Sequence, residues 1–194
     1  MSLAPSEAAA ALREKYADQV VEVIEFRGEV AVELKPEALQ AAATFLRDDA
    51  GYDLPVDAMA VDFEDTEPRF LVLWELMSTK LAANIRLRVR TTEDEEEVPT
   101  LSHLYPGMEW MEREVYDMSG VRFTGHPDLR RILMWPGYPF HPLRKEFPLE
   151  GKSSEEPGFA FSNPAPLEGG PFHAAPSAEH AHEREPRSNA PKLD

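Results

Sequence analysis

The chain has 194 residues, of which 42% are hydrophobic, and this is enough for one globular domain with a core of its own. It contains no cysteine, so disulfide bonds and thiolate-ligated zinc or iron–sulfur centres cannot form within it. The formal net charge of −16 excludes nucleic-acid binding through a bulk basic footprint. No apolar run has the ~20 residues of a membrane span, and the N-terminus lacks a signal-peptide pattern, so we expect a soluble cytoplasmic protein.

The first third of the sequence predicts a helix, a β-hairpin and a second helix. Residues 6–17 combine Ser6, a favourable N-cap residue, with an alanine-rich run. Residues 20–26 and 29–35 predict two strands joined by a tight turn, because apolar and polar side chains alternate in the second of them. Residues 36–48 predict a helix that begins at a proline. Its apolar face consists of Leu39, Ala42, Ala43 and Leu46.

Three more strands are predicted in the middle of the chain, over residues 56–65, 69–77 and 83–91. The second is apolar at nearly every position, as expected of a central strand covered on both faces. In the first, large apolar residues alternate with smaller or polar ones; these are Met59, Val61 and Phe63. The order of elements, αββαβββ, predicts an α+β domain in which helices flank an antiparallel or mixed sheet.

Arg86, Arg88 and Arg90 form a stripe along the last of these strands. Such a stripe could bind phosphate or another anion. It is also typical of a solvated strand face opposite acidic neighbours such as Glu75, and we favour this second interpretation. The acidic run 93–97 that follows predicts an exposed loop.

The composition changes near residue 150. We expect residues 1–150 to form the domain, whereas residues 151–194 are rich in Pro, Gly, Ala and Ser and show no periodicity. Because such a segment cannot bury enough surface to fold alone, it is predicted to be disordered or to lie extended on a partner. We interpret its histidines as incidental and not as metal ligands; they are His173, His180 and His182.

Residues 108–118 predict a helix that ends at Gly120. Glu109, Arg113 and Asp117 are spaced i, i+4 and i+8, so Arg113 could form an ion pair with a carboxylate one turn away on either side. One face of this helix is apolar, which is typical of a core or of a partner interface. That face carries Met108, Met111, Val115 and Met118.

The segments 123–133 and 141–149 mix Pro, Gly and charged residues with large apolar ones and have no helix or strand period. Their main-chain groups must therefore bond to side chains or to another chain. His126, Asp128 and His141, together with Glu112 or Glu114, are chemically able to hold a metal or to act as acids and bases. However, the sequence has no zinc-protease, nucleophile-elbow, phosphate-loop or dinucleotide motif, and we favour structural hydrogen bonding for these histidines.

Three blocks of this region resemble the 30-kDa subunit family of respiratory complex I, in order and in spacing. The first is Glu112-Arg113-Glu114 followed by Asp117. The second is His126-Pro127-Asp128-Leu129-Arg130-Arg131-Ile132-Leu133, and the third is His141-Pro142-Leu143-Arg144-Lys145. The resemblance covers roughly residues 15–150, and the α+β prediction agrees with the fold of that family.

The resemblance implies a structural subunit of NADH–quinone oxidoreductase, the C-subunit in bacteria, with no catalytic residue, no metal and no cofactor of its own. FMN and Fe-S clusters would lie in partner subunits, which carry electrons from NADH to quinone while protons are pumped. The chain would belong to the peripheral arm, on the cytoplasmic side of the bacterial inner membrane. Its neighbours would be the quinone-site D-subunit, of 49-kDa type, and the Fe-S-binding B-subunit.

The residues that match the family blocks are predicted to form an interface or a structural network. They are Glu112, Arg113, Glu114, Asp117, His126, Pro127, Asp128, Arg130, Arg131, His141, Arg144 and Lys145. Two alternatives stay open. One is the homologous subunit of a membrane-bound hydrogenase-type or ferredoxin-linked complex, and the other is a stand-alone metal-dependent hydrolase that uses His126, Asp128 and His141.

Overall fold

The structure is a computed structural model that describes residues 2–92, 97–149 and 151. The chain divides into two compact units, and the first of them, Met1–Phe147, contains all the helices and strands given below. The prediction of an extended or disordered tail over residues 151–194 falls, apart from Gly151, outside the described residues.

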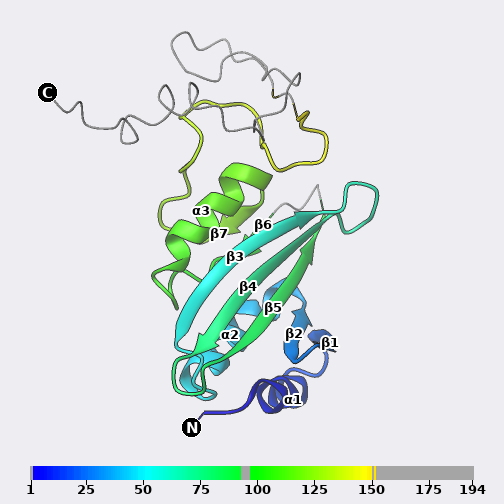
Figure 1. The fold of residues 1–194 in the computed structure, drawn as a ribbon, viewed down its shortest axis with the longest axis vertical. Helices are drawn as coiled ribbons and strands as arrows, with labels where there is room; N and C mark the ends of the chain where they lie inside the picture. The colour runs from blue at the N-terminus through cyan, green and yellow to red at the C-terminus, as the bar shows by residue number, and fades with distance from the viewer. Residues whose placement is uncertain (1, 93–96, 150, 152–194) are drawn as a thin grey trace, which may run out of the picture. The chain divides into compact units, whose positions relative to one another are not determined.

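A five-stranded sheet forms the centre of the first unit (Figure 1). The strand order is β1-β2-β5-β4-β3, and neighbours are antiparallel except for β2 and β5, which are parallel. This confirms the predicted α+β class and identifies the sheet as mixed. The strands are β1 Val20–Phe26, β2 Glu29–Leu34, β3 Leu54–Asp62, β4 Phe70–Ser78 and β5 Ala83–Thr91.

Two helices and a 3-10 turn precede β3, namely α1 Pro5–Lys15, η1 Pro36–Ala38 and α2 Leu39–Asp48. The prediction that Ser6 caps the first helix is wrong. Ala4 is the N-cap, because Pro5 has a fixed φ that suits the first helical position and lacks the N–H that would be unbonded there. The Glu7 carboxylate accepts a hydrogen bond from the Ala4 N–H at 3.0 Å, which satisfies one of the free donors at this helix end.

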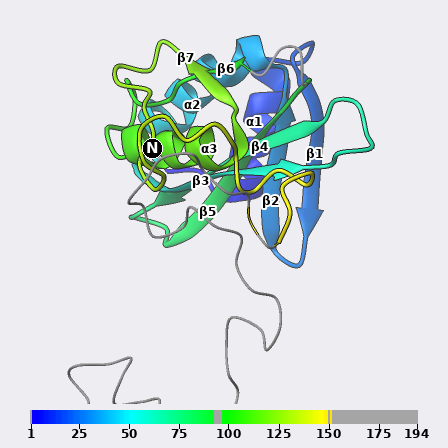
Figure 2. The same ribbon diagram turned by 90° about the horizontal axis from the view of Figure 1, so that it is seen from above.

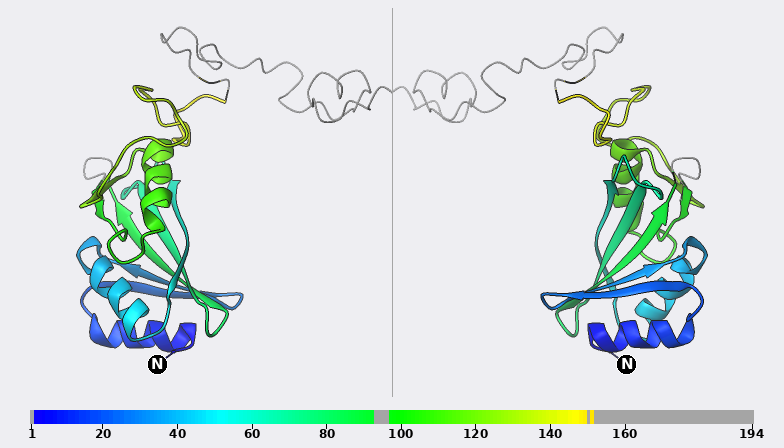
Figure 3. Two further views of the ribbon diagram at one scale, coloured as in Figure 1. Left: turned by 90° about the vertical axis from the view of Figure 1, so that its left-hand side faces the viewer. Right: turned by 90° about the vertical axis from the view of Figure 1, so that its right-hand side faces the viewer.

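One hydrophobic core lies between the sheet and the helices, which pack on the same face of it (Figures 2 and 3). Helix α2 buries the four residues predicted for its apolar face, Leu39, Ala42, Ala43 and Leu46. From the sheet, Val32, Val72, Trp74 and Leu87 are fully buried in this core. The alternation of large apolar residues in β2 and β5 therefore identified the inner face of both strands.

A second, two-stranded sheet was not predicted. β6 (Glu97–Pro99) pairs in parallel with β7 (Arg122–Thr124), and helix α3 (Met108–Ser119) lies between them in the sequence. Of the run predicted as a loop, Glu97 begins β6 and residues 93–96 lie outside the described residues. After β7, residues 125–147 form turns and bends without a helix or strand, and we call them the arm.

No helix among the described residues covers the other face of the sheet, which we call the open face. β4 is nevertheless buried along nearly its whole length, as predicted, because side chains of β3 and β5 flank Leu71 and Leu73. The large apolar residues of β3 point to this open face, whereas small or polar ones, such as Ala58 and Asp62, point inward. The alternation of large apolar residues with small or polar ones thus predicted that this segment is a strand, but not which of its faces the helices cover.

The arginine stripe also lies on the open face, and its guanidinium groups are paired with carboxylates there. Arg86 contacts Glu75 at 2.7 Å, and Arg88 and Arg90 contact Glu33 at 3.0 and 3.1 Å. The interpretation as a strand face opposite acidic neighbours is confirmed, and the second acidic partner, Glu33, comes from the parallel strand β2.

Candidate interaction site on helix α3 and the arm

Helix α3 positions the first of the three family blocks. Met108, Val115 and Met118 face the core, as predicted, and Gly120 ends the helix with a left-handed φ of 87°. Three charged residues of the helix are buried as well: Glu112, Arg113 and Asp117. Since a buried polar group is costly unless it is bonded, each of them must have a defined partner.

Asp117 holds the first half of the arm against α3. Its side chain is fully buried, and one carboxylate oxygen accepts the main-chain N–H groups of Ile132, Leu133 and Met134 at 2.8–3.0 Å. The other oxygen pairs with Arg131 at 2.5 Å. Burial would raise the pKa of Asp117, but these N–H groups and the Arg131 guanidinium lower it below its ordinary value. Three main-chain N–H groups of this irregular segment thus find their acceptor within the same chain.

Arg113 bonds to the arm and not to its neighbours on the helix. It donates to the main-chain carbonyls of Arg130 and Arg131, both at 3.1 Å, and its guanidinium lies over the Trp110 ring, 5.1 Å from the centroid. The predicted ion pair of Arg113 with Glu109 or Asp117 is wrong. The arm brings two main-chain carbonyls to Arg113, and it brings Arg131 to Asp117. Residue spacing within the helix could not predict these contacts, because the partners lie in the arm.

His126 connects the start of the arm to α3. Its Nε2 lies 3.0 Å from the Glu109 carbonyl, and its Nδ1 accepts the Asp128 N–H at 3.1 Å, so Nε2 carries the proton. Both ring nitrogens are thus engaged by main-chain groups. Among the described residues, no group of three or more His, Asp or Glu side chains is arranged to hold a metal ion.

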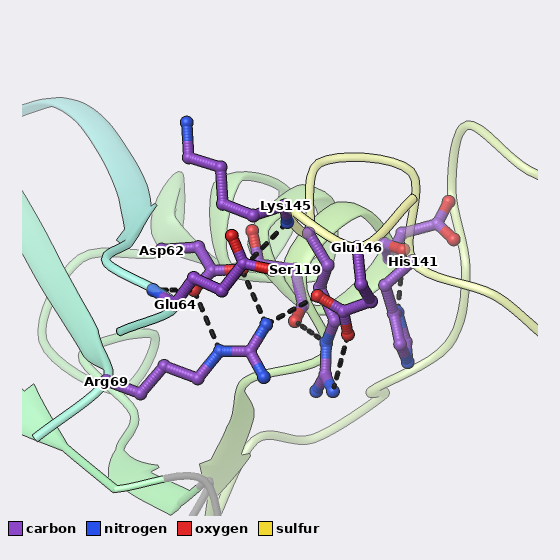
Figure 4. Close-up of polar contacts among 9 residues, drawn as sticks. Asp62, Glu64, Arg69, Ser119, His141, Lys145 and Glu146 are labelled. Atoms are coloured by element: carbon purple, nitrogen blue, oxygen red, sulfur yellow. Dashed lines mark hydrogen bonds and ion pairs between the residues drawn. The ribbon is translucent and has the colours of Figure 1, made fainter. Parts of the chain in front are cut away.

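A second carboxylate, Asp62 at the end of β3, holds the last part of the arm (Figure 4). It accepts both Nε and Nη2 of Arg69 at 2.8 Å and the main-chain N–H of Lys145 at 2.9 Å. Arg69 also reaches Glu146 at 2.5 Å. The hydrogen bonds from Arg69 outweigh burial and lower the pKa of Asp62 far below its ordinary value.

Arg144 and His141 pack this part of the arm against the end of α3. Arg144 donates to the Ser119 carbonyl at 2.7 Å and lies over the Phe70 ring, and His141 Nδ1 lies 3.0 Å from the Asp117 carbonyl. These side chains fill the space beside Gly120. A Cβ at that position would lie 2.9 Å from His141 Cδ2 and closer still to Arg144.

Glu112 is bonded within the core and does not reach the arm. Its carboxylate accepts the Leu101 N–H at 2.7 Å, the Trp74 indole N–H at 3.3 Å and the Thr100 hydroxyl. Burial raises the pKa of Glu112 to about 7 and outweighs the opposing hydrogen bonds from Thr100, Leu101 and Trp74. Glu112 therefore braces α3 against β4 and the segment before α3.

The structure separates the twelve predicted residues by exposure. Seven are buried or half-buried and bond within the chain, namely Glu112, Arg113, Asp117, His126, Arg131, His141 and Arg144. Five are exposed, namely Glu114, Pro127, Asp128, Arg130 and Lys145.

Sequence reasoning missed two groups of residues. Asp62, Arg69 and Glu146 come together from distant positions, and no local pattern signals this. The exposed apolar side chains near the arm were also not singled out; Trp110, Leu133 and Leu143 are 59–63% exposed. Exposed tryptophan is typical of the centre of a protein–protein interface, so Trp110 on the polar side of α3 was the available signal.

The sequence matches a family model described as the respiratory-chain NADH dehydrogenase, 30 Kd subunit, over residues 32–153. The NADH-quinone oxidoreductase C-subunit of Geotalea uraniireducens (strain Rf4) is 41% identical over 144 residues, which cover 74% of this chain and 88% of the relative. The C-subunit of the same enzyme from Sinorhizobium medicae (strain WSM419) is 48% identical over 126 residues, 64% of this chain and 62% of the relative.

Two solved structures share the fold. A trypsin-resistant fragment (1-134) of Nqo5 is 28% identical, with a TM-score of 0.55 over 62% of this chain and 97% of the fragment. A chain of the membrane-bound sulfane sulfur reductase, an archaeal respiratory membrane complex, is 25% identical, with a TM-score of 0.60 over 74% of this chain and 85% of that one.

Proposed function

Because this chain belongs to the 30-kDa subunit family of the respiratory-chain NADH dehydrogenase, we propose that it is a structural subunit of NADH–quinone oxidoreductase that holds its neighbours in position. It carries no redox centre in this proposal, and FMN and Fe-S clusters lie in partner subunits. The sequence has no cysteine, which supports the placement of the Fe-S clusters in other subunits, since such clusters are held by cysteine thiolates.

The observation that supports the proposal is that the arm has buried contacts on its inner side and exposed side chains on its outer side. Asp117 and Asp62 accept four main-chain N–H groups of the arm, so contacts within the chain hold the arm in place. Its outward side chains, Arg130, Leu133 and Leu143, are 60–70% exposed. A preorganised surface of this kind binds a partner without a large ordering cost.

The partners that we propose are the quinone-site D-subunit, of 49-kDa type, and the Fe-S-binding B-subunit. Within the complex, electrons from NADH reach quinone while protons are pumped, and this chain would sit in the peripheral arm on the cytoplasmic side of the inner membrane. Among the described residues, no helix is long and apolar enough to cross a membrane. Attachment to the membrane would then be indirect, through other subunits.

One observation favours a second candidate. The likeness to a chain of the sulfane sulfur reductase supports a role in another membrane-bound respiratory complex. The candidate of this kind that we keep is a hydrogenase-type or ferredoxin-linked complex. The two candidates differ in the electron donor, and the donor-binding subunits that accompany the chain distinguish them.

The test is purification of a tagged copy of the full chain from native membranes in mild detergent, with the partners identified and quantified by mass spectrometry. We expect flavin, Fe-S and membrane subunits in fixed stoichiometry, including an NADH-binding chain. The same set without an NADH-binding chain would support the second candidate. Recovery of the chain alone would contradict both.

A further inference from the structure

An apolar strip runs along edge strand β3 on the open face of the sheet. We define the β3 strip as Met59, Val61 and Phe63 together with Leu71 and Leu73 of β4. Met59, Val61 and Phe63, which directly follows β3, are 39–40% exposed, and the nearly buried Leu71 and Leu73 lie beside them. Strand pairing places Met59 beside Leu73 and Val61 beside Leu71, and Phe63 lies under the Arg90 guanidinium, so the five side chains share one face. Contiguous exposed apolar surface on a globular protein marks an interaction site.

The edge of β3 is protected against pairing with another strand. Pro55 has no N–H to offer, and the Asp57 carboxylate accepts the outward Ala58 N–H at 2.8 Å. A partner is therefore expected to pack on the side chains of the strip and not to extend the sheet.

The charges around the strip favour a basic partner. The arginines of the open face are already paired with Glu33 and Glu75, so they leave little free positive charge. Beside the strip, by contrast, Asp57 and the turn residues Glu64, Asp65 and Glu67 are exposed. A second copy of this chain would bring these carboxylates together in a protein whose net charge is already −16, which disfavours self-association.

We propose that the β3 strip is a docking surface for an apolar segment flanked by lysine or arginine, supplied by another subunit of the same complex. The inference rests on the proposed function for the source of that segment. The strip lies on the face of the sheet opposite α3, so the chain would contact two neighbours through two separate surfaces. This arrangement would explain how a subunit without a cofactor fixes the positions of others.

Met59 provides a native probe, because exposed methionine is oxidised to the sulfoxide by peroxide. Oxidation of Met59 is measured by peptide mass spectrometry in the isolated full chain and in the purified complex. We expect Met59 to react in the isolated chain and to react several-fold more slowly in the complex. Equal rates in the two samples would overturn the inference while leaving the proposed function intact.

Because the chain has no cysteine, Val61→Cys introduces a unique thiol for a photo-crosslinker. Val21→Cys on edge strand β1, where Val21 is 59% exposed, is the matched control. We expect Val61→Cys in the purified complex to crosslink to a peptide of another subunit that has apolar residues beside Lys or Arg, and Val21→Cys not to yield that product. A crosslink to a second copy, a crosslink to an acidic segment or the same product from both sites would contradict the inference. Failure of the tagged chain to recover any other subunit would overturn both this inference and the proposed function.

Discussion

The Asp117 carboxylate and the Arg131 guanidinium, fourteen residues apart in the sequence, meet at 2.5 Å where the arm crosses helix α3. The same carboxylate holds three consecutive main-chain N–H groups. One buried side chain therefore fixes the course of a segment that has no regular secondary structure.

Asp117→Asn should lower the free energy of unfolding by about 3–5 kcal/mol, because it leaves the Arg131 guanidinium without its buried partner. Hydrogen exchange of the amides of residues 132–134 should become faster. Chemical denaturation and exchange mass spectrometry measure the two effects. Asp128→Asn is the control, since the exposed Asp128–Arg130 pair should contribute less than about 1 kcal/mol. Similar losses in both variants would contradict the role of Asp117.

Arg69→Lys should loosen the last part of the arm but not the first. Lysine keeps the positive charge but lacks the planar guanidinium that bonds to both Asp62 and Glu146. The free energy of unfolding should therefore fall by about 1–3 kcal/mol. Exchange of the Lys145 amide should become faster, while the amides held by Asp117 stay protected. Arg86→Lys on the open face, where the side chain is 32% exposed, should have a smaller effect. Loss of protection at both ends of the arm would show that the two carboxylates do not act separately.

Glu112 should make stability depend on pH near neutrality. Its pKa is about 7 in the folded chain, against an ordinary value of 4.5, so between these values the folded state binds a proton that the unfolded state has lost. Stability should therefore fall as pH rises from about 4.5 to 7, by up to about 3 kcal/mol, and this contribution should change no further above that range. The lowered pKa values of Asp62 and Asp117 act in the opposite sense, because the stability they contribute is lost as pH falls below about 4.

Glu112→Gln mimics the protonated acid and should remove most of the fall between pH 5 and pH 7. Urea unfolding of both proteins across this range is the measurement. The other titrating groups are common to the two proteins, so the difference between the two curves reports on Glu112. Parallel curves would show that Glu112 is already ionised in the folded chain at pH 5.

Gly120→Ala should destabilise the chain more than Gly28→Ala. Both glycines have a left-handed φ, 87° and 85°, so alanine is strained at either position by about 1–2 kcal/mol. At Gly120 the new Cβ would meet His141 and Arg144, whereas no described residue lies within 4 Å of a Cβ at Gly28. The free energy of unfolding of each variant is measured by thermal or chemical unfolding. The difference between the two decreases reports on the packing of the arm against α3. Equal losses would mean that the arm moves aside freely.

Local patterns predicted the hairpin, α2, β5 and α3, because each of them depends on periodicity and on residues close in sequence. The capping of α1 was misassigned because Ser6 competes with Pro5 and the proline dominates. The face of β3 was not predictable, because alternation separates two faces without indicating which one the helices cover. The same limit applies to the site: spacing on α3 suggested a partner for Arg113 within the helix, and the arm supplied different ones.

The three family blocks contain residues of two kinds, those that brace the fold and those that are exposed. Arg130 and Arg131 are adjacent and look equivalent in the sequence, yet Arg131 is 13% exposed and bonded to Asp117, and Arg130 is 70% exposed. Charge reversal at Arg131 would disturb the arm itself. Arg130 is therefore the residue that tests the surface without disturbing the fold.

Whether the arm holds neighbouring subunits can be measured as the yield of assembled complex in cells that express Arg130→Glu in place of the native chain, on native gels of detergent-solubilised membranes. The control is Arg13→Glu, which reverses the charge of an exposed arginine on α1. If the arm is the surface that holds neighbouring subunits, Arg130→Glu should lower the yield and Arg13→Glu should not, while both isolated chains unfold like the native one. Normal assembly with Arg130→Glu, or an equal loss with both variants, would contradict the account.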